Sequence, residues 1–126
     1  MNILIIDDID AAREILIELL KIKFPTIVFY QSSNILETLE ITNRVNFDLI
    51  ILDLQLEDSD YKTDCEISGL RLLRKLKKTK KNVVILTAMF NNYYFTECTK
   101  LGTKYIQKNN YKNLLEELSN IIKEVA

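Results

Sequence analysis

Short apolar runs alternate along the chain with longer segments in which apolar residues recur at helical spacing. Three continuous runs cover residues 3–6, 49–52 and 83–86, and residues 27–30 and 103–106 are two further candidates. Runs of this length that are rich in β-branched residues are typical of strands in a parallel sheet covered on both faces. The pattern therefore predicts five strands.

Helical spacing fills the intervals between these runs. The segments concerned are residues 10–23, 33–44, 69–78, 90–101 and 111–125. We expect Asp10 and Ser33 to cap the first two helices, and Gly102 to end the fourth. The predicted inward stripes of the first two helices are Ile15, Leu19 and Ile22, and Ile35, Leu36 and Leu39.

A strand followed by a helix, repeated along the chain, predicts an α/β fold with right-handed crossovers. We expect one domain over residues 1–126, a flavodoxin-like (βα)5 unit. Its doubly wound parallel sheet would have the strand order 2-1-3-4-5, with helices on both faces. In such sheets the chemistry lies at the carboxyl ends of the strands.

Polar residues follow several of the predicted strands. Asp7 and Asp8 follow the first, Asp53 the third and Thr87 the fourth, while the fifth leads into Lys108. Because the first and third strands are neighbours in this order, these groups would converge. Close carboxylates repel unless a cation joins them, and oxygen ligands of this kind suit Mg²⁺ or Mn²⁺. One carboxylate could then attack phosphorus while an ammonium neutralises the phosphoryl oxygens.

Composition excludes several function classes. The 17 basic and 18 acidic residues give a net charge of −1, which argues against nucleic-acid binding driven by bulk charge. The absence of histidine removes the commonest general base and the commonest zinc ligand. Two cysteines and no long apolar span are typical of a cytoplasmic domain, so we expect neither a disulfide framework nor a membrane segment.

The segments NILIIDD, DLIILD, VVILTA and KYIQK together resemble a bacterial two-component response-regulator receiver domain of the CheY-like superfamily. The resemblance implies that Asp53 accepts a phosphoryl group from a histidine kinase or phosphotransfer protein. It also implies a Mg²⁺ site made by Asp8 directly, Asp7 through water, Asp53 and the backbone carbonyl of Gln55.

The resemblance further implies that Lys108 binds the phosphoryl group and that Thr87 and Tyr105 form a switch. The switch would rearrange a surface made by the fourth helix, fifth strand and fifth helix, where an unidentified downstream protein binds. It implies no turnover enzyme and no direct contact with nucleic acid or membrane, and it allows a phosphorylation-linked homodimer.

Two other classes of function compete with this one. A phosphatase of the haloacid-dehalogenase type needs an aspartate two residues after its nucleophile, and Gln55 stands there. A protein-docking module on the same fold would work without phosphorylation. Phosphodonor uptake separates this alternative from the receiver.

The chain departs from the receiver pattern in three places. Glu57 replaces a proline four residues after Asp53, and Asn109 replaces the proline, in a cis peptide, that follows the lysine. The glycine that opens the third helix is displaced to Gly69, so the acidic loop at about 54–68 is lengthened. A long loop in a compact domain is often functional.

Aromatic residues crowd the fourth helical segment. The predicted buried stripe is Tyr94, Cys98 and Leu101. This placement leaves Tyr93 or Phe95 exposed, and an exposed aromatic side chain suggests an interface.

Overall fold

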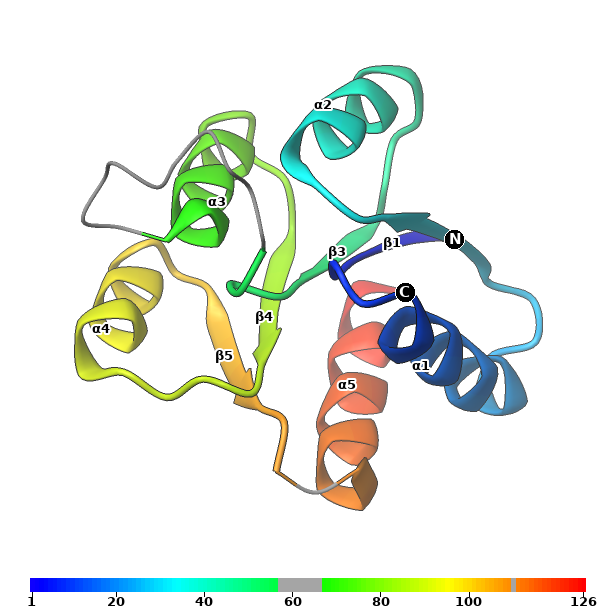
Figure 1. Cartoon of the computed structure of the whole chain (residues 1–126). Helices are drawn as coiled ribbons and strands as arrows, with labels where there is room; N and C mark the ends of the chain where they lie inside the picture. Colours follow the sequence, from blue (N-terminus) through cyan, green and yellow to red (C-terminus); the bar gives the residue numbers. More distant parts are fainter. Residues whose placement is uncertain (57–66, 110) are drawn as a thin grey trace.

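The computed structural model describes residues 1–56, 67–109 and 111–126. Their strands form one parallel sheet in the order β2-β1-β3-β4-β5 (Figure 1). The strands are β1 (Asn2–Ile6), β2 (Val28–Ser32), β3 (Leu49–Leu52), β4 (Val83–Thr87) and β5 (Lys104–Gln107). The helices are α1 (Asp10–Lys23), α2 (Ile35–Arg44), α3 (Ser68–Lys78), α4 (Asn92–Lys100) and α5 (Tyr111–Val125). This is the predicted flavodoxin-like fold, with two strands displaced by one or two residues.

The sheet separates two apolar cores. Successive side chains of a strand point to opposite faces, so Ile3 and Ile5 of β1 pack with α1 and α5, whereas Leu4 and Ile6 join the core on the other face. Figure 1 shows α1 and α5 on one side of the sheet and α2, α3 and α4 on the other. Because both faces are covered, β1, β3 and β4 read as unbroken apolar runs.

The register of the strands brings their carboxyl ends to one edge. Ile6 of β1 lies opposite Leu52 of β3, and Thr87 of β4 lies opposite Gln107 of β5. Asp7 and Asp53 each follow the last residue of a paired strand, so the ladder itself makes them neighbours. Lys108 enters the same edge directly after β5.

The buried face of α1 differs from the prediction. Ile15 and Ile22 are exposed, and the buried residues are Arg13, Leu16, Ile17 and Leu20. The segment has apolar residues on two sides, so helical spacing alone does not choose between them. Asp10 is the first residue of the helix rather than its cap, because Ile9 holds the N-cap position.

The second helix also differs in detail. Leu36 is exposed, whereas Thr38 and Thr42 are buried. Both threonine hydroxyls donate to carbonyls of the preceding turn, which satisfies them without water. Asn34, not Ser33, caps the helix by accepting from the backbone N–H of Glu37.

The stripe on α4 is as predicted. Tyr94 and Cys98 are buried and Leu101 packs against the same core, while Tyr93 and Phe95 are both exposed. The helix begins two residues later than expected, because Asn91 caps it through its side-chain oxygen. Burial raises the pKa of the Cys98 thiol to about 11. This is the behaviour of a core residue rather than of a reactive cysteine.

Gly69 lets the first turn of α3 approach the backbone that follows β3. A Cβ on Gly69 would lie 2.6 Å from the carbonyl carbon of Leu54 and closer still to its oxygen and Cα. Ser68 adds a hydrogen bond to the carbonyl of Leu56 at 2.8 Å. The predicted long loop lies largely outside the described residues, as does Glu57.

Replacing Gly69 by alanine should therefore destabilise the protein by about 3 kcal/mol, since backbone rather than a side chain must move. Gly102 is the matched control, because it has φ +71° with open space around it. Gly102→Ala should lower the free energy of unfolding by only about 1 kcal/mol, the cost of a left-handed alanine. Urea unfolding of both variants checks this, and equal losses would contradict it.

Candidate functional site

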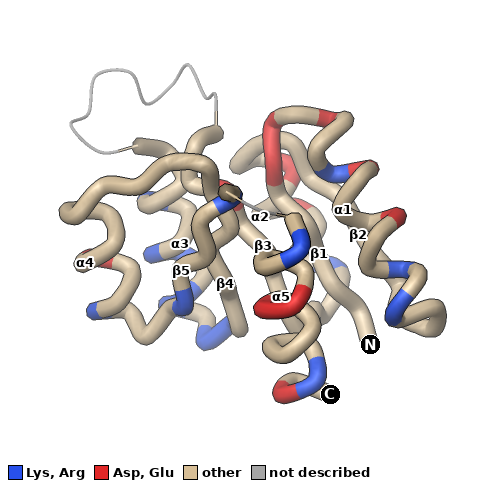
Figure 2. Tube along the Cα trace, turned by 90° about the horizontal axis from the view of Figure 1, so that it is seen from below, with Lys and Arg blue, Asp and Glu red and all other residues tan. Residues whose placement is uncertain are grey.

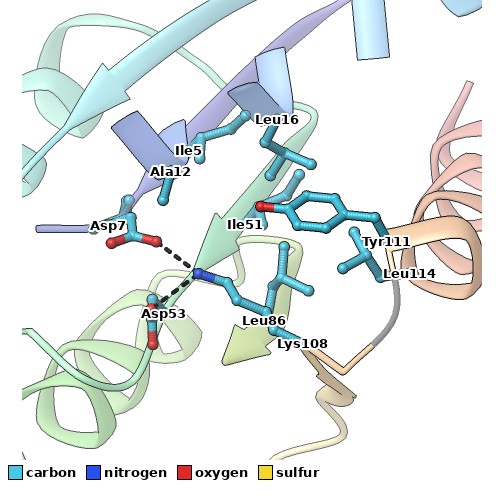
Figure 3. Close-up of a pocket in the computed structure, with 11 residues that line it drawn as sticks. Ile5, Asp7, Ala12, Leu16, Ile51, Asp53, Leu86, Lys108, Tyr111 and Leu114 are labelled. Carbon is cyan, nitrogen blue, oxygen red and sulfur yellow. Dashed lines mark hydrogen bonds and ion pairs between the residues drawn. The ribbon is translucent and has the colours of Figure 1, made fainter. Parts of the chain in front are cut away.

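The ammonium of Lys108 lies between two carboxylates at the carboxyl edge of the sheet (Figure 3). Its Nζ is 2.7 Å from Asp7 Oδ2 and 3.2 Å from Asp53 Oδ2. The two aspartate side chains are only 5% and 9% exposed. Residues from β1, β3 and the end of β5 thus form one buried ionic cluster, which we call the acidic site.

Backbone hydrogen bonds fix the position of each member. The N–H of Asp53 donates to Ile6 at 2.9 Å, which continues the ladder of β1 and β3 by one residue. The N–H of Lys108 donates to Thr87 at 2.8 Å and does the same for β4 and β5. Asn109 donates to Gln107 at 3.0 Å. The peptide bonds of the described residues include no cis bond.

Burial and charge pairing oppose each other in the acidic site. Desolvation raises the pKa of Asp53, although the N–H of Gln55, the Lys108 ammonium and the Thr87 side chain all act to lower it. Burial alone would lower the pKa of Lys108, but its contacts with Asp7 and Asp53 outweigh burial and raise it. Two carboxylates and one ammonium leave the cluster short of positive charge.

The donor set fits Mg²⁺. This ion is usually held by one or two carboxylates and keeps several waters, and Asp7 and Asp53 face a common point. Gln55 is exposed, and its N–H donates to Asp53 Oδ1 at 2.9 Å. Asp8 follows directly and is half-buried. Within residues 1–56, 67–109 and 111–126, no three acidic or thiol groups form a metal cluster by themselves.

A small cavity of about 20 Å³ adjoins the cluster. Its volume is enough for about one water molecule. Asp7, Asp53 and Lys108 form its polar wall, and side chains from β1, β3, β4, α1 and α5 form the rest. Tyr111 of α5 extends its ring over this cavity (Figure 3). Sequence reasoning treated Tyr111 only as the start of a helix and so missed it.

Arg13 is a second residue that sequence reasoning missed. It belongs to the inward face of α1 and is 8% exposed, and its guanidinium donates to the carbonyl of Asp7. The sequence does contain a signal for its burial, because Arg13 stands three positions before Leu16 and four before Ile17, on the same face of the helix. Acidic positions surround the turn from β1 into α1, as the charge-coloured trace shows (Figure 2).

Thr87 and Tyr105 lie on neighbouring strands beside the acidic site. Thr87 is fully buried, and its hydroxyl accepts from the N–H of Met89 at 3.4 Å. The Tyr105 hydroxyl donates to the carbonyl of Met89 at 2.5 Å. The Tyr105 ring packs edge-on against Phe90 and Phe95. Both residues therefore contact the segment that joins β4 to α4.

Tyr105 also lines an open groove between α4, β5 and α5, with a volume of about 500 Å³. Phe95 of α4 and Ile121 of α5 contribute apolar surface to it. Lys104 of β5 and Glu124 of α5 form an ion pair at its rim, with Nζ and Oε2 3.2 Å apart.

Tyr105→Phe should lower the free energy of unfolding by about 1 kcal/mol at neutral pH, since it deletes the hydrogen bond to Met89. Desolvation raises the pKa of Tyr105 to about 12, so the folded state holds this proton more tightly than the unfolded state. The resulting stability is complete below the unfolded pKa of about 10 and is lost as the pH rises towards about 12.

Urea unfolding between about pH 9 and pH 11 should therefore cost the wild type more stability than the Tyr105→Phe variant. Tyr93→Phe is the control, because Tyr93 is 50% exposed. If the wild type and Tyr105→Phe lose the same stability over this interval, the described burial of the phenol is contradicted.

No helix in the described part of the chain is both long and apolar enough to cross a membrane. The family profile of the response regulator receiver domain matches residues 3–120. No curated protein sequence matches the chain.

Solved structures resemble the chain over nearly its whole length. A CheY-like response regulator receiver domain protein from Methanospirillum hungatei JF-1 is 23% identical, with a TM-score of 0.80 and coverage of 98% of this chain and 94% of that one. A two-component response regulator from Clostridium difficile has the same identity of 23% and TM-score of 0.80, with coverage of 98% and 96%.

A third structure is the response regulator protein TrrA from Thermotoga maritima in complex with Mg²⁺-BeF. It is 25% identical, with a TM-score of 0.75 and coverage of 99% of this chain and 98% of that one. The family profile covers far more than half of the sequence, and the observed strand order is the one predicted for it. The chain therefore belongs to the family of response regulator receiver domains, which are signalling domains of two-component systems.

Proposed function

We propose that this chain accepts a phosphoryl group on Asp53 from a histidine kinase or a phosphotransfer protein. The observation that carries the proposal is the buried pairing of the Lys108 ammonium with Asp7 and Asp53. Family membership supports it, and so does the Mg²⁺-BeF complex of TrrA, a relative similar to the chain along 99% of its length. As a partner of such kinases, the domain would act in the cytoplasm.

The transfer is a nucleophilic displacement at phosphorus. A carboxylate oxygen of Asp53 forms the new P–O bond as the P–N bond of the donor phosphohistidine breaks, and the electron pair of that bond stays on the imidazole. Attack by water on phosphorus later releases phosphate and restores the carboxylate. Each cycle consumes one phosphodonor and modifies the domain itself, so the product is a signal rather than a turned-over substrate.

Burial prepares Asp53 and Lys108 for this chemistry. Lys108 already contacts the Asp53 carboxylate, so its ammonium is in reach of phosphoryl oxygens that add there. Mg²⁺ or Mn²⁺, when bound, would neutralise charge on those oxygens. Asp7, Asp8, Asp53 and the backbone carbonyl of Gln55 would hold the ion.

The response would pass through Thr87 and Tyr105. In the proposed switch, the Thr87 hydroxyl turns towards the phosphoryl group, and Tyr105 moves inward behind it. Both contact Met89 at the start of the β4–α4 segment, so a change at Thr87 alters the surroundings of Tyr105. Phosphorylation would then shift a population between two states, through contacts made in only one of them.

The downstream partner would bind over α4, β5 and α5. The groove between these elements supports this proposal, because Tyr105 lines it together with exposed Phe95. A rotation of Tyr105 would reshape the groove directly. A protein partner, including a second phosphorylated copy of this domain, fits a surface that combines aromatic rings with an ion pair at its rim.

Intact mass after incubation with Mg²⁺ and acetyl phosphate tests the proposal. We expect one added phosphoryl group on the wild type, because acetate can leave from phosphorus as the donor imidazole does. Asp53→Asn should show none, since the nucleophile is gone. Asp48→Asn is the matched control, because Asp48 is an exposed acid just before the same strand and should leave phosphorylation intact.

Other outcomes separate the alternatives. Addition of a phosphoryl group to the Asp53→Asn variant would show that another residue is the acceptor. If the wild type neither reacts with acetyl phosphate nor binds Mg²⁺ in calorimetry, the proposal is overturned and the docking module is favoured. If the wild type binds Mg²⁺ but takes up no phosphoryl group from acetyl phosphate, the experiment is repeated with a phosphorylated histidine protein as the donor. Failure to accept a phosphoryl group from that donor would also overturn the proposal.

A further inference from the structure

Arg13 is a buried cation with a specific set of partners. Its side chain is only 9% exposed, although it lies on the same helix face as Leu16 and Leu20. A charge in such surroundings is costly unless it is paired and hydrogen-bonded. The identity of the partners therefore indicates what the residue does.

The guanidinium joins two separate segments. One terminal nitrogen donates to the backbone carbonyl of Asp7, and the other donates to the carboxylate of Asp10. The third nitrogen, Nε, donates to the side-chain oxygen of Gln31 on β2 at 3.0 Å. In the described part of the chain, its partners thus lie in the turn after β1, at the first residue of α1 and near the end of β2.

Asp7 is consequently held to β2 at both of its backbone polar groups. Its N–H donates to the carbonyl of Ser32 at 3.2 Å, and its carbonyl reaches Gln31 through Arg13. The side chain of Asp7 accepts from the N–H of Ile9 at 2.9 Å and from Lys108 at 2.7 Å. A fixed backbone at Asp7 fixes the point from which its carboxylate reaches Lys108.

Simple charge pairing does not account for this arrangement. Among the residues that the structure describes, Asp10 is the only carboxylate that pairs with Arg13, and its side chain is 78% exposed. Exposed ion pairs contribute little, because water and salt screen them. A cation placed for pairing alone has no need of the Asp7 carbonyl or of Gln31.

We propose that Arg13 is a positioning residue for Asp7, and through Asp7 for the divalent cation of the acidic site. The proposal rests on the proposed function for the cation, but the backbone restraint at Asp7 stands apart from it. Groups that orient metal ligands from behind typically change metal affinity by about 10–100-fold when they are removed.

The sign of the effect distinguishes positioning from charge. Removing a nearby positive charge should strengthen the binding of a cation, by Coulomb's law. Loss of positioning should weaken it. Arg13→Gln should therefore bind Mg²⁺ about tenfold more weakly than the wild type, in calorimetry on protein first treated with chelator. Arg13→Lys keeps the charge but lacks the fork of donors, so it should also bind more weakly.

Lys21→Gln is the matched control, since it removes one positive charge from an exposed position on the same helix. It should bind Mg²⁺ as the wild type does. Equal or tighter binding by Arg13→Gln would overturn the proposal. If Arg13→Gln fails to fold, Gln31→Ala replaces it, because this variant removes the anchor of Nε and keeps every charge. Unchanged affinity in Gln31→Ala would then overturn the proposal.

A second measurement uses metal-free protein and so does not depend on the proposed function. Hydrogen exchange of the buried Asp7 amide, followed by NMR, should be faster in Arg13→Gln than in the wild type and Lys21→Gln. Unchanged exchange would overturn the positioning role. A wild type that binds no Mg²⁺, with faster exchange in Arg13→Gln, would instead refute the cation site and leave the restraint on Asp7 standing.

Discussion

The structure depends on one shared ammonium. Lys108 enters after β5, at the far side of β4 from the strands that carry Asp7 and Asp53, and its long side chain reaches both carboxylates. Without a cation, two buried carboxylates at the ends of adjacent strands would repel and tend to take up a proton. The parallel register forces this proximity, because Ile6 and Leu52 are paired immediately before the two aspartates. The ionic cluster is thus a consequence of the topology, and the topology is tolerated because the cluster contains a cation.

Much of this was predictable from the sequence, for a physical reason. Strands covered on both faces must be apolar throughout, so β1, β3 and β4 stand out as unbroken runs, and the residues that follow them are located at once. The strand order then places Asp7, Asp53, Thr87 and Lys108 along one edge. The faces of α1 and α2 were less predictable, because Ile15 and Leu36 are as apolar as the residues that are buried. Contacts made across the fold decide between such faces. Arg13 turns inward to reach Asp7, and the buried hydroxyl of Thr38 forms a hydrogen bond with the hydroxyl of Ser32 on β2.

Contacts within the fold also account for two positions at which the chain departs from the family pattern. Asn109 stands where a cis proline is usual, yet Lys108 is held in place by its own ladder bond to Thr87 and by its two carboxylate partners. Gly69 is shifted along the sequence relative to the usual spacing, and it packs against the backbone of Leu54 next to Asp53. In both places the residue has well-defined contacts in this structure, although the sequence spacing or residue type departs from the family pattern. The spacing of a sequence motif therefore predicts the position of such a residue less well than its contacts in the fold do.

The proposed switch follows from the fact that Lys108 is already engaged before any phosphoryl group arrives. Its contacts with Asp7 and Asp53 use at least two of the three ammonium hydrogens. New phosphoryl oxygens on Asp53 would compete for these donors, and the movement of Lys108 would begin at the end of β5, three residues after Tyr105. Tyr105 is bonded to Met89, which in turn donates to Thr87. A redistribution of hydrogen bonds at the acidic site therefore has a short route, through β4 and β5, to the groove between α4 and α5. In the proposed switch, the hydrogen bonds of Lys108 and Tyr105 would be exchanged for others rather than lost, so the free-energy difference between the two states could stay small enough for a single phosphoryl group to reverse it.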